Sequence, residues 1–112
     1  MSKIALALYV DGEISRFAIQ DDELEVLQGI VGGWVQCIGL RPDLTLWCND
    51  DGKLMQLPHN PLAQAVWDKY IGQGTDVIVG NVVLLGGVDE EGETLGIGQD
   101  LAGLIVSMLI DE

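Results

Sequence analysis

Few side chains of this sequence could serve as nucleophiles or as a general base. Its single histidine, His59, stands in a Pro-His-Asn-Pro segment, which is typical of a loop that leads into a helix. A histidine base needs a nucleophile within hydrogen-bond reach and a group that orients the ring. Ser2, Ser15 and Ser107 lie in no nucleophile-elbow pattern. We therefore expect no hydrolase and no other enzyme.

The spacing of potential metal and phosphate ligands is equally uninformative. Cys37 and Cys48 form no Cys-x-x-Cys pair, whereas structural zinc sites take four Cys or His ligands. The loop 89–93 is acidic but lacks the full pattern of a calcium-binding EF-hand. The glycine-rich stretches 29–33 and 92–98 lack the Lys-Ser/Thr ending of a phosphate-binding loop. We expect neither a metal nor a cofactor.

Net charge is the most unusual property of the chain. Eighteen Asp and Glu oppose five Lys and Arg, which gives −13, whereas a small soluble domain usually carries a charge of magnitude about 2 to 8. Such a field repels phosphate backbones, because nucleic-acid binding depends on Lys and Arg. We therefore expect no direct binding to nucleic acid. The charge favours docking on a basic surface, including the nucleic-acid groove of another protein, and solubility alone is the alternative explanation.

The acidic residues that we assign to such a docking surface fall into two clusters. The first opens a predicted helix, where the helix dipole favours carboxylates, and the second forms a loop. These candidate partner-binding residues are Asp21, Asp22, Glu23, Glu25, Asp89, Glu90, Glu91 and Glu93.

Two other functions compete with this hypothesis. A sponge that sequesters a small nucleotide signal needs cationic or aromatic groups, which a dimer interface could supply twice. A homo-oligomeric scaffold is suggested by the segment 101–110, which is apolar enough to pack against a second copy. The candidate ligand-binding residues of the sponge are Arg16, Arg41, Lys53, His59, Asn60 and Trp67.

Length and hydropathy predict one domain over residues 1–112. No stretch reaches the roughly 18 to 20 apolar residues of a membrane span. The apolar start of the chain is followed at once by Asp11-Gly12-Glu13, without a small-residue cleavage site. We expect a cytoplasmic protein without a membrane partner, and reduced cysteines in that compartment.

The first third of the chain predicts a β-hairpin and a helix. Asp11-Gly12 separates two β-compatible runs, 3–10 and 14–19, which is a strong hairpin signal. Apolar residues then recur at helical spacing over residues 21–31, and Gly32-Gly33 ends this run.

A second hairpin is predicted around Pro42-Asp43, with strands over 34–40 and 44–49. If that pair forms the centre of the turn, paired residue numbers sum to 85. Cys37 then faces Cys48, as buried free thiols or as a disulfide.

The same register places Trp34 and Trp47 on one face together with Ile38, either as core or as an exposed contact site. A short third strand is predicted over 53–57.

The remaining chain predicts a helix, a strand and a last helix. Asn60 should cap a helix that begins at Pro61, with Trp67 half exposed at its edge. A strand over 76–88 should bulge or bend at Gly80-Asn81, with a tight turn at this pair as the alternative. The last helix, 99–110, should be capped by Gln99 or Asp100. The fold class is α+β, with a mostly antiparallel sheet of about five to seven strands and three helices.

Five short segments recur in a characteristic order: Val10–Glu13, Val31–Val35, Asn49–Leu54, Leu57–Ala63 and Asp76–Val82. This order resembles that of a family described as domain of unknown function 3846. The resemblance implies a small acidic protein of a bacteriophage, plasmid or other mobile element, and it carries no catalytic residues over. Together with the charge, it favours an inhibitor of a host defence or nucleic-acid-handling protein.

Overall fold

The structure is a computed structural model, and it describes residues 2–110. Within these residues an antiparallel sheet of five strands has the order β2-β1-β5-β4-β3. The α+β class is confirmed, with a strand number at the bottom of the expected range. The elements are β1 (Lys3–Leu8), β2 (Ile14–Ile19), α1 (Glu23–Val31), β3 (Val35–Arg41), β4 (Leu44–Asn49), α2 (Pro61–Tyr70), β5 (Val82–Leu85) and α3 (Gln99–Ile110).

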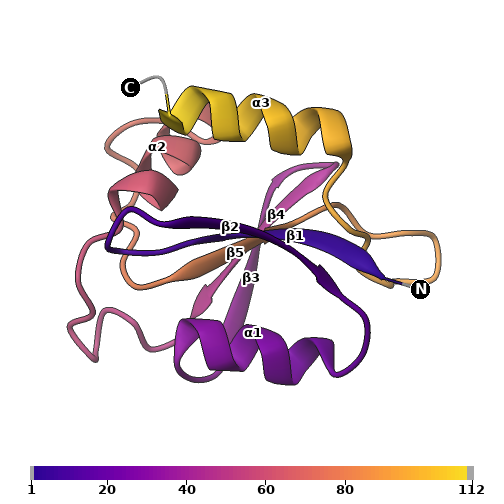
Figure 1. The fold of residues 1–112 in the computed structure, drawn as a ribbon. Helices are drawn as coiled ribbons and strands as arrows, with labels where there is room; N and C mark the ends of the chain where they lie inside the picture. Colours follow the sequence, from indigo (N-terminus) through magenta and orange to yellow (C-terminus); the bar gives the residue numbers. More distant parts are fainter. Residues whose placement is uncertain (1, 111–112) are drawn as a thin grey trace.

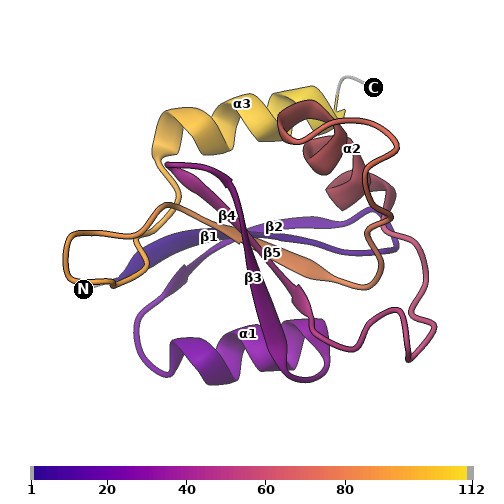
Figure 2. The same ribbon diagram turned by 180° about the vertical axis from the view of Figure 1, so that it is seen from behind.

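Helices cover both faces of the sheet (Figure 1). Helix α1 lies on one face, and α2 and α3 lie together on the other, as the reverse view also shows (Figure 2). Side chains alternate between the two faces along a strand, so Leu6 and Leu84 join the core under α2 and α3, whereas Ala7 and Val83 join the core under α1. The central strands β1 and β5 are therefore apolar on both faces.

The first hairpin and helix form as predicted. Strands β1 and β2 pair in regular register around the Asp11-Gly12 turn. Helix α1 carries Glu23 and Glu25 in its first turn, and Gly32 ends it with a hydrogen bond from its N–H to the Gln28 carbonyl (2.8 Å). Asp22 precedes the helix in a left-handed conformation and makes no side-chain cap.

The predicted register of the second hairpin is wrong by one residue. Strands β3 and β4 pair Cys37 with Trp47 and Ile38 with Leu46, and the register shifts between Gly39 and Arg41. This bulge adds a residue on β3 next to the turn. Cys37 and Cys48 therefore point to opposite faces of the sheet, and both are free thiols. Cys37 is exposed and Cys48 is half-buried, contrary to the expectation of two buried thiols.

The same shift separates the two tryptophans. Trp47 packs against the core under α1, whereas Ile38 packs against the core under α2 and α3. Trp34 precedes β3 and is 72% exposed. The expectation that Trp34, Trp47 and Ile38 share one face is therefore wrong.

Two of the predicted strands are largely replaced by loops. Residues 50–56 form consecutive turns instead of a strand over 53–57. The strand expected over 76–88 is reduced to β5, preceded by an isolated bridge between His59 and Val79. Gly80 has a positive φ of 77°, and its N–H bonds to the Pro58 carbonyl (2.8 Å). Such a backbone turn favours glycine and ends the extended segment before β5.

Helix α2 begins as predicted, because Asn60 accepts a hydrogen bond from the Ala63 N–H (3.0 Å) and Pro61 occupies the first turn. Trp67 is only 7% exposed, so the half-exposed position expected for it is wrong. Helix α3 begins at Gln99, which leaves Gly98 before it in place of the expected caps. None of the helices in residues 2–110 is long and apolar enough to cross a membrane.

Candidate acidic docking surface

The two predicted acidic clusters flank the beginning of β1. Lys3, the first residue of β1, forms an ion pair with Glu23 of α1 (Nζ to Oε1, 2.9 Å). On the other side, Ile97 donates its N–H to the Ile4 carbonyl (2.8 Å), which ties the loop after β5 to the same strand. Both ribbon views place the start of α1 and this loop at one end of the molecule (Figures 1 and 2).

The acidic loop is an ordered hairpin. The Asp89 carboxylate accepts hydrogen bonds from the N–H groups of Glu91 and Glu93 (2.9 Å each). The Asp89 N–H bonds to the Glu93 carbonyl, and Val88 bridges to Thr94. With the backbone groups satisfied in this way, the side chains of Glu90, Glu91 and Glu93 remain exposed to solvent.

Close backbone contact holds this loop against the turn between β3 and β4. A Cβ atom on Gly87 would lie 2.0 Å from the Pro42 carbonyl oxygen, so only glycine permits this approach. The contact brings Asp43 to the same end. The start of α3, whose first turn contains Asp100, lies at this end as well (Figure 1). No local sequence pattern indicated that Asp43 and Asp100 lie at this end, because their position depends on packing between segments that are distant in the sequence.

We define the acidic end by the eight predicted carboxylates together with Asp43 and Asp100. Its neighbouring cations, Lys3 and Arg41, are both held in ion pairs, with Glu23 and Asp43 respectively. Among residues 2–110, no other lysine or arginine forms an ion pair with a carboxylate of the acidic end. The members of the acidic end are Asp21, Asp22, Glu23, Glu25, Asp43, Asp89, Glu90, Glu91, Glu93 and Asp100, all exposed except Glu23, which is half-buried.

The six candidate residues of a nucleotide sponge are not brought together. Arg16 is exposed on the edge strand β2, and Arg41 stands at the end of β3 over the Tyr70 ring (5.6 Å). Lys53 lies in the loop after β4, and the His59 ring contacts the Gln64 amide (3.1 Å). These positions share no common pocket.

The other two sponge candidates are structural. Asn60 is fully buried, and its amide donates hydrogen bonds to the Leu8 carbonyl (2.9 Å) and the Gly80 carbonyl (2.8 Å). The Trp67 indole N–H donates to the Thr75 hydroxyl (2.7 Å). The polar groups of both side chains are therefore taken up by the fold.

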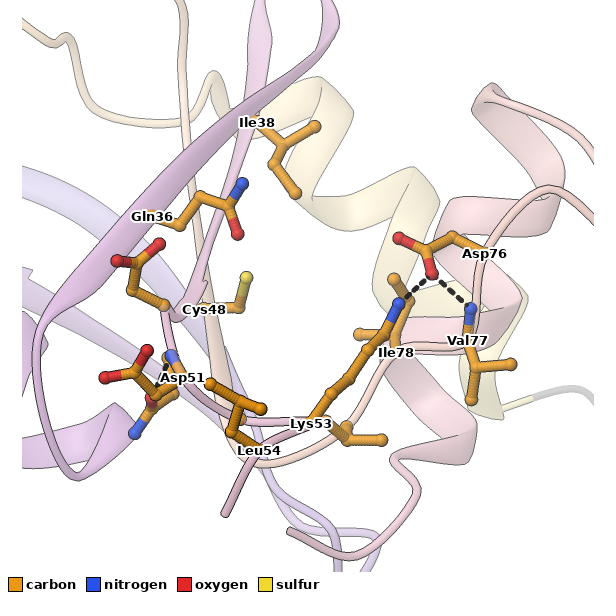
Figure 3. A pocket seen from close by; sticks show the side chains of 13 residues that line it. Gln36, Ile38, Cys48, Asp51, Lys53, Leu54, Asp76, Val77 and Ile78 are labelled. Carbon is orange, nitrogen blue, oxygen red and sulfur yellow. Dashed lines mark hydrogen bonds and ion pairs between the residues drawn. The ribbon is translucent and has the colours of Figure 1, made fainter. Parts of the chain in front are cut away.

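A pocket of about 270 Å³ lies away from the acidic end, between the loop after β4 and the segment before β5 (Figure 3). The Cys48 thiol faces it, and Ile38 and Ile78 are among its apolar walls. Lys53 reaches across to an ion pair with Asp76, whose carboxylate also accepts the Val77 N–H (2.8 Å). Sequence reasoning missed this pocket, because residues 53–57 were predicted as a strand.

Two groups around the pocket have shifted pKa values. Burial, with the nearby Asp50 and Asp76 carboxylates, raises the pKa of Cys48 to about 11. The Cys48 thiol is therefore neutral at pH 7 and is a poor nucleophile. The hydrogen bond from Lys53 lowers the pKa of Asp76 below its ordinary value.

The chain belongs to the family described as Domain of unknown function (DUF3846), whose model matches residues 4–110. The similarity inferred from the short segments is thereby confirmed. No curated protein and no solved structure matches the chain.

Proposed function

We propose that this protein is an acidic binding protein that inhibits a host defence or nucleic-acid-handling protein by occupying its basic surface. The observation that supports the proposal is that two acidic clusters, distant in sequence, lie on either side of the beginning of β1, at one end of the sheet. Its exposed carboxylates can contact a partner without unfolding the core. The protein acts in the cytoplasm of the host and performs no catalysis.

Electrostatics supports this mode of binding. A surface with one dominant sign of charge accelerates encounter with a surface of the opposite sign. The hairpin around Asp89 fixes its backbone by internal hydrogen bonds, so little order has to be gained when it docks. Carboxylates held in this way can take the positions that phosphates occupy on a nucleic-acid-binding protein.

The test is affinity capture from bacterial lysate with matched charge variants. One variant neutralises the acidic loop (D89N, E90Q, E91Q and E93Q), and the amide introduced by D89N keeps an oxygen that can accept the loop hydrogen bonds. The control neutralises four carboxylates elsewhere in the sequence that belong neither to the acidic end nor to the pocket of Figure 3 (D11N, E13Q, D68N and E112Q), so both variants lose the same charge.

We expect wild type and control to retain the same nucleic-acid-handling partner, and the loop variant to lose it. Retention by the loop variant would contradict docking through the acidic end. Equal loss in both variants would show that total charge, and not its placement, determines binding.

The outer face of α3 supports a second proposal, a homodimer. Leu104 is 56% exposed and Ile110 is 67% exposed, and burying such side chains stabilises association. Light scattering of wild type and Leu104→Ser tests it, with a dimer expected only for wild type. A wild-type monomer at high concentration would refute the dimer.

A further inference from the structure

The pocket of Figure 3 combines apolar walls with an acidic rim. We propose that it binds a long basic side chain, Lys or Arg, of a protein partner. The aliphatic stem would pack between Ile38 and Ile78, and the cationic head would lie at Asp50 and Asp51. This inference is independent of docking by the acidic end, because it concerns a different surface.

The walls suit a hydrocarbon stem. Ile78 is buried and Ile38 half-buried, and the Cys48 thiol between the loops adds an uncharged, polarisable surface. At the mouth, Leu54 is 86% exposed and Val77 is 55% exposed. A stem inserted here would remove apolar surface of both partners from water, which is favourable. Lys and Arg commonly bury their stems in this way while the charged head stays near water.

The charges at the mouth of the pocket favour a ligand with a positively charged head group. Three carboxylates, of Asp50, Asp51 and Asp76, line the pocket together with one cation, Lys53. Lys53 is paired with Asp76. Asp50 and Asp51 are exposed, and neither forms an ion pair with a lysine or arginine of residues 2–110. A cation is therefore attracted to the rim, whereas an anion is repelled.

Hydrogen bonds fix the loops that form the walls of the pocket. The Asn49 amide donates to the Val31 carbonyl (3.1 Å) and its oxygen accepts the Asp51 N–H (2.8 Å), which fixes the acidic rim. On the facing wall, the Asn60 N–H bonds to the Ile78 carbonyl (3.0 Å). The Leu57 N–H closes the intervening turn on the Gly52 carbonyl (3.0 Å). A preformed pocket binds without a large ordering cost.

Trp34 indicates that the occupant belongs to a protein. The Trp34 carbonyl accepts the Asp50 N–H (2.8 Å), which extends the β3–β4 ladder by one pair. By strand alternation, Trp34 stands on the same face as Gln36 and Cys48, which line the pocket. Its indole is 72% exposed. An exposed tryptophan beside a pocket is typical of a contact site for a protein. A protein chain extends beyond the one side chain that enters the pocket, so it can also contact Trp34.

The experiment uses probes with one alkyl chain and different heads: hexylammonium, hexanol and hexanoate. Each is titrated into the full chain and followed by amide NMR shifts at Ile38, Cys48 and Ile78. We expect saturable shifts with hexylammonium, weaker ones with hexanol and none with hexanoate. The absence of pocket shifts with hexylammonium, or equal binding of hexanoate, would overturn the inference.

Matched variants separate the rim from the overall charge. D50N/D51N should weaken hexylammonium binding by about three- to tenfold, whereas E90Q/E91Q, which removes the same charge at the acidic end, should leave it unchanged. Equal weakening in both variants would overturn the role of the rim. Neither pair includes a side chain of the buried core, and unchanged amide spectra of the free variants verify the fold.

A last comparison distinguishes a protein side chain from a free amine. The probe is the peptide acetyl-Gly-Leu-Arg-Gly-amide, tested on wild type and Trp34→Ala. We expect the Trp34→Ala variant to bind the peptide several-fold more weakly and hexylammonium equally well. A wild type that binds hexylammonium but not the peptide would refute a protein partner and assign the pocket to small free cations, and peptide binding that does not respond to Trp34→Ala would refute the contact assigned to Trp34.

Discussion

The acidic end and the pocket are built by different means. At the acidic end, backbones approach closely at glycines, as Gly87 does against the Pro42 carbonyl and Gly96 against Ile4. Around the pocket, the Asn49 amide bonds to the Val31 carbonyl and the Asp51 N–H, and next to the facing wall the Asn60 amide donates to the Leu8 and Gly80 carbonyls. The charged side chains of the acidic end take little part in these contacts, whereas the pocket depends on the side chains that shape it.

The difference follows from what each surface must present. An exposed, charged end needs only a compact backbone, because its carboxylates are solvated. A concave pocket separates loops, and each separated loop leaves buried N–H and C=O groups that must find partners. Asparagine can satisfy both kinds of group with one side chain. We therefore expect substitution of these buried asparagines to affect stability more than substitution of the exposed acidic residues.

Asn60→Ala should have the largest effect. It removes two hydrogen bonds from a buried amide and the cap of α2, which should lower the free energy of unfolding by about 3–5 kcal/mol. Urea denaturation measures the loss. Asn81→Ala is the matched control, because the Asn81 side chain is half-buried and accepts one short hydrogen bond, from the Val10 N–H (3.0 Å). Equal losses in the two variants would contradict the role assigned to Asn60.

Gly87→Ala should have the next largest effect. The new Cβ would lie 2.0 Å from the Pro42 carbonyl oxygen, so the acidic loop and the β3–β4 turn must separate, at a cost of about 3 kcal/mol. Thermal or urea unfolding measures it. Gly29→Ala, in a helix with nothing within 4 Å of its Cβ, should instead stabilise by about 0.5–1 kcal/mol. A Gly87→Ala variant as stable as wild type would show that the contact is not tight.

Neutralising the acidic loop should change stability only slightly. The variant with D89N, E90Q, E91Q and E93Q loses like-charge repulsion, and we expect a gain of up to about 1 kcal/mol at low salt. The gain should disappear at high salt, because screening removes the repulsion. Urea unfolding at two salt concentrations measures it. A large loss of stability would mean that these carboxylates hold the fold, contrary to their exposure.

Asp76→Asn should give the smallest effect. The Lys53 hydrogen bond lowers the pKa of Asp76 in the folded chain, so this carboxylate contributes stability above its unfolded pKa. The contribution is lost as the pH falls through the folded pKa. Because the pair is exposed to solvent, we expect about 0.5 kcal/mol at pH 7. The difference in unfolding free energy between wild type and variant should vanish in acid. A difference that persists at the lowest pH would contradict the ion pair as its cause.

Local signals predicted much of the fold. Asp11-Gly12 predicted the first hairpin, Gly32 the end of α1, and Asn60-Pro61 the start of α2, because each depends on neighbouring residues only. The register of β3 and β4 could not be obtained in this way. It depends on a bulge beside Pro42-Asp43, which shifts the pairing of Cys37 from Cys48 to Trp47.

The sequence predicted most residues of the acidic end but did not predict the pocket. The acidic residues could be identified by type and position alone, but their common position at one end depends on the Lys3 and Ile97 contacts across the chain. The pocket could not be predicted, because the pattern of residues 53–57 indicates a strand, whereas the segment turns back on itself next to the buried Gly52. Long-range packing decides both features.

The most direct test of docking through the acidic end is the association rate of the captured partner at different ionic strengths. The screening length falls from about 30 Å at 0.01 M to about 8 Å at 0.15 M. We predict that the wild-type rate falls by at least about tenfold over this range, and that the loop-neutralised variant shows a much weaker dependence. A wild-type rate that does not change with salt would contradict electrostatic docking.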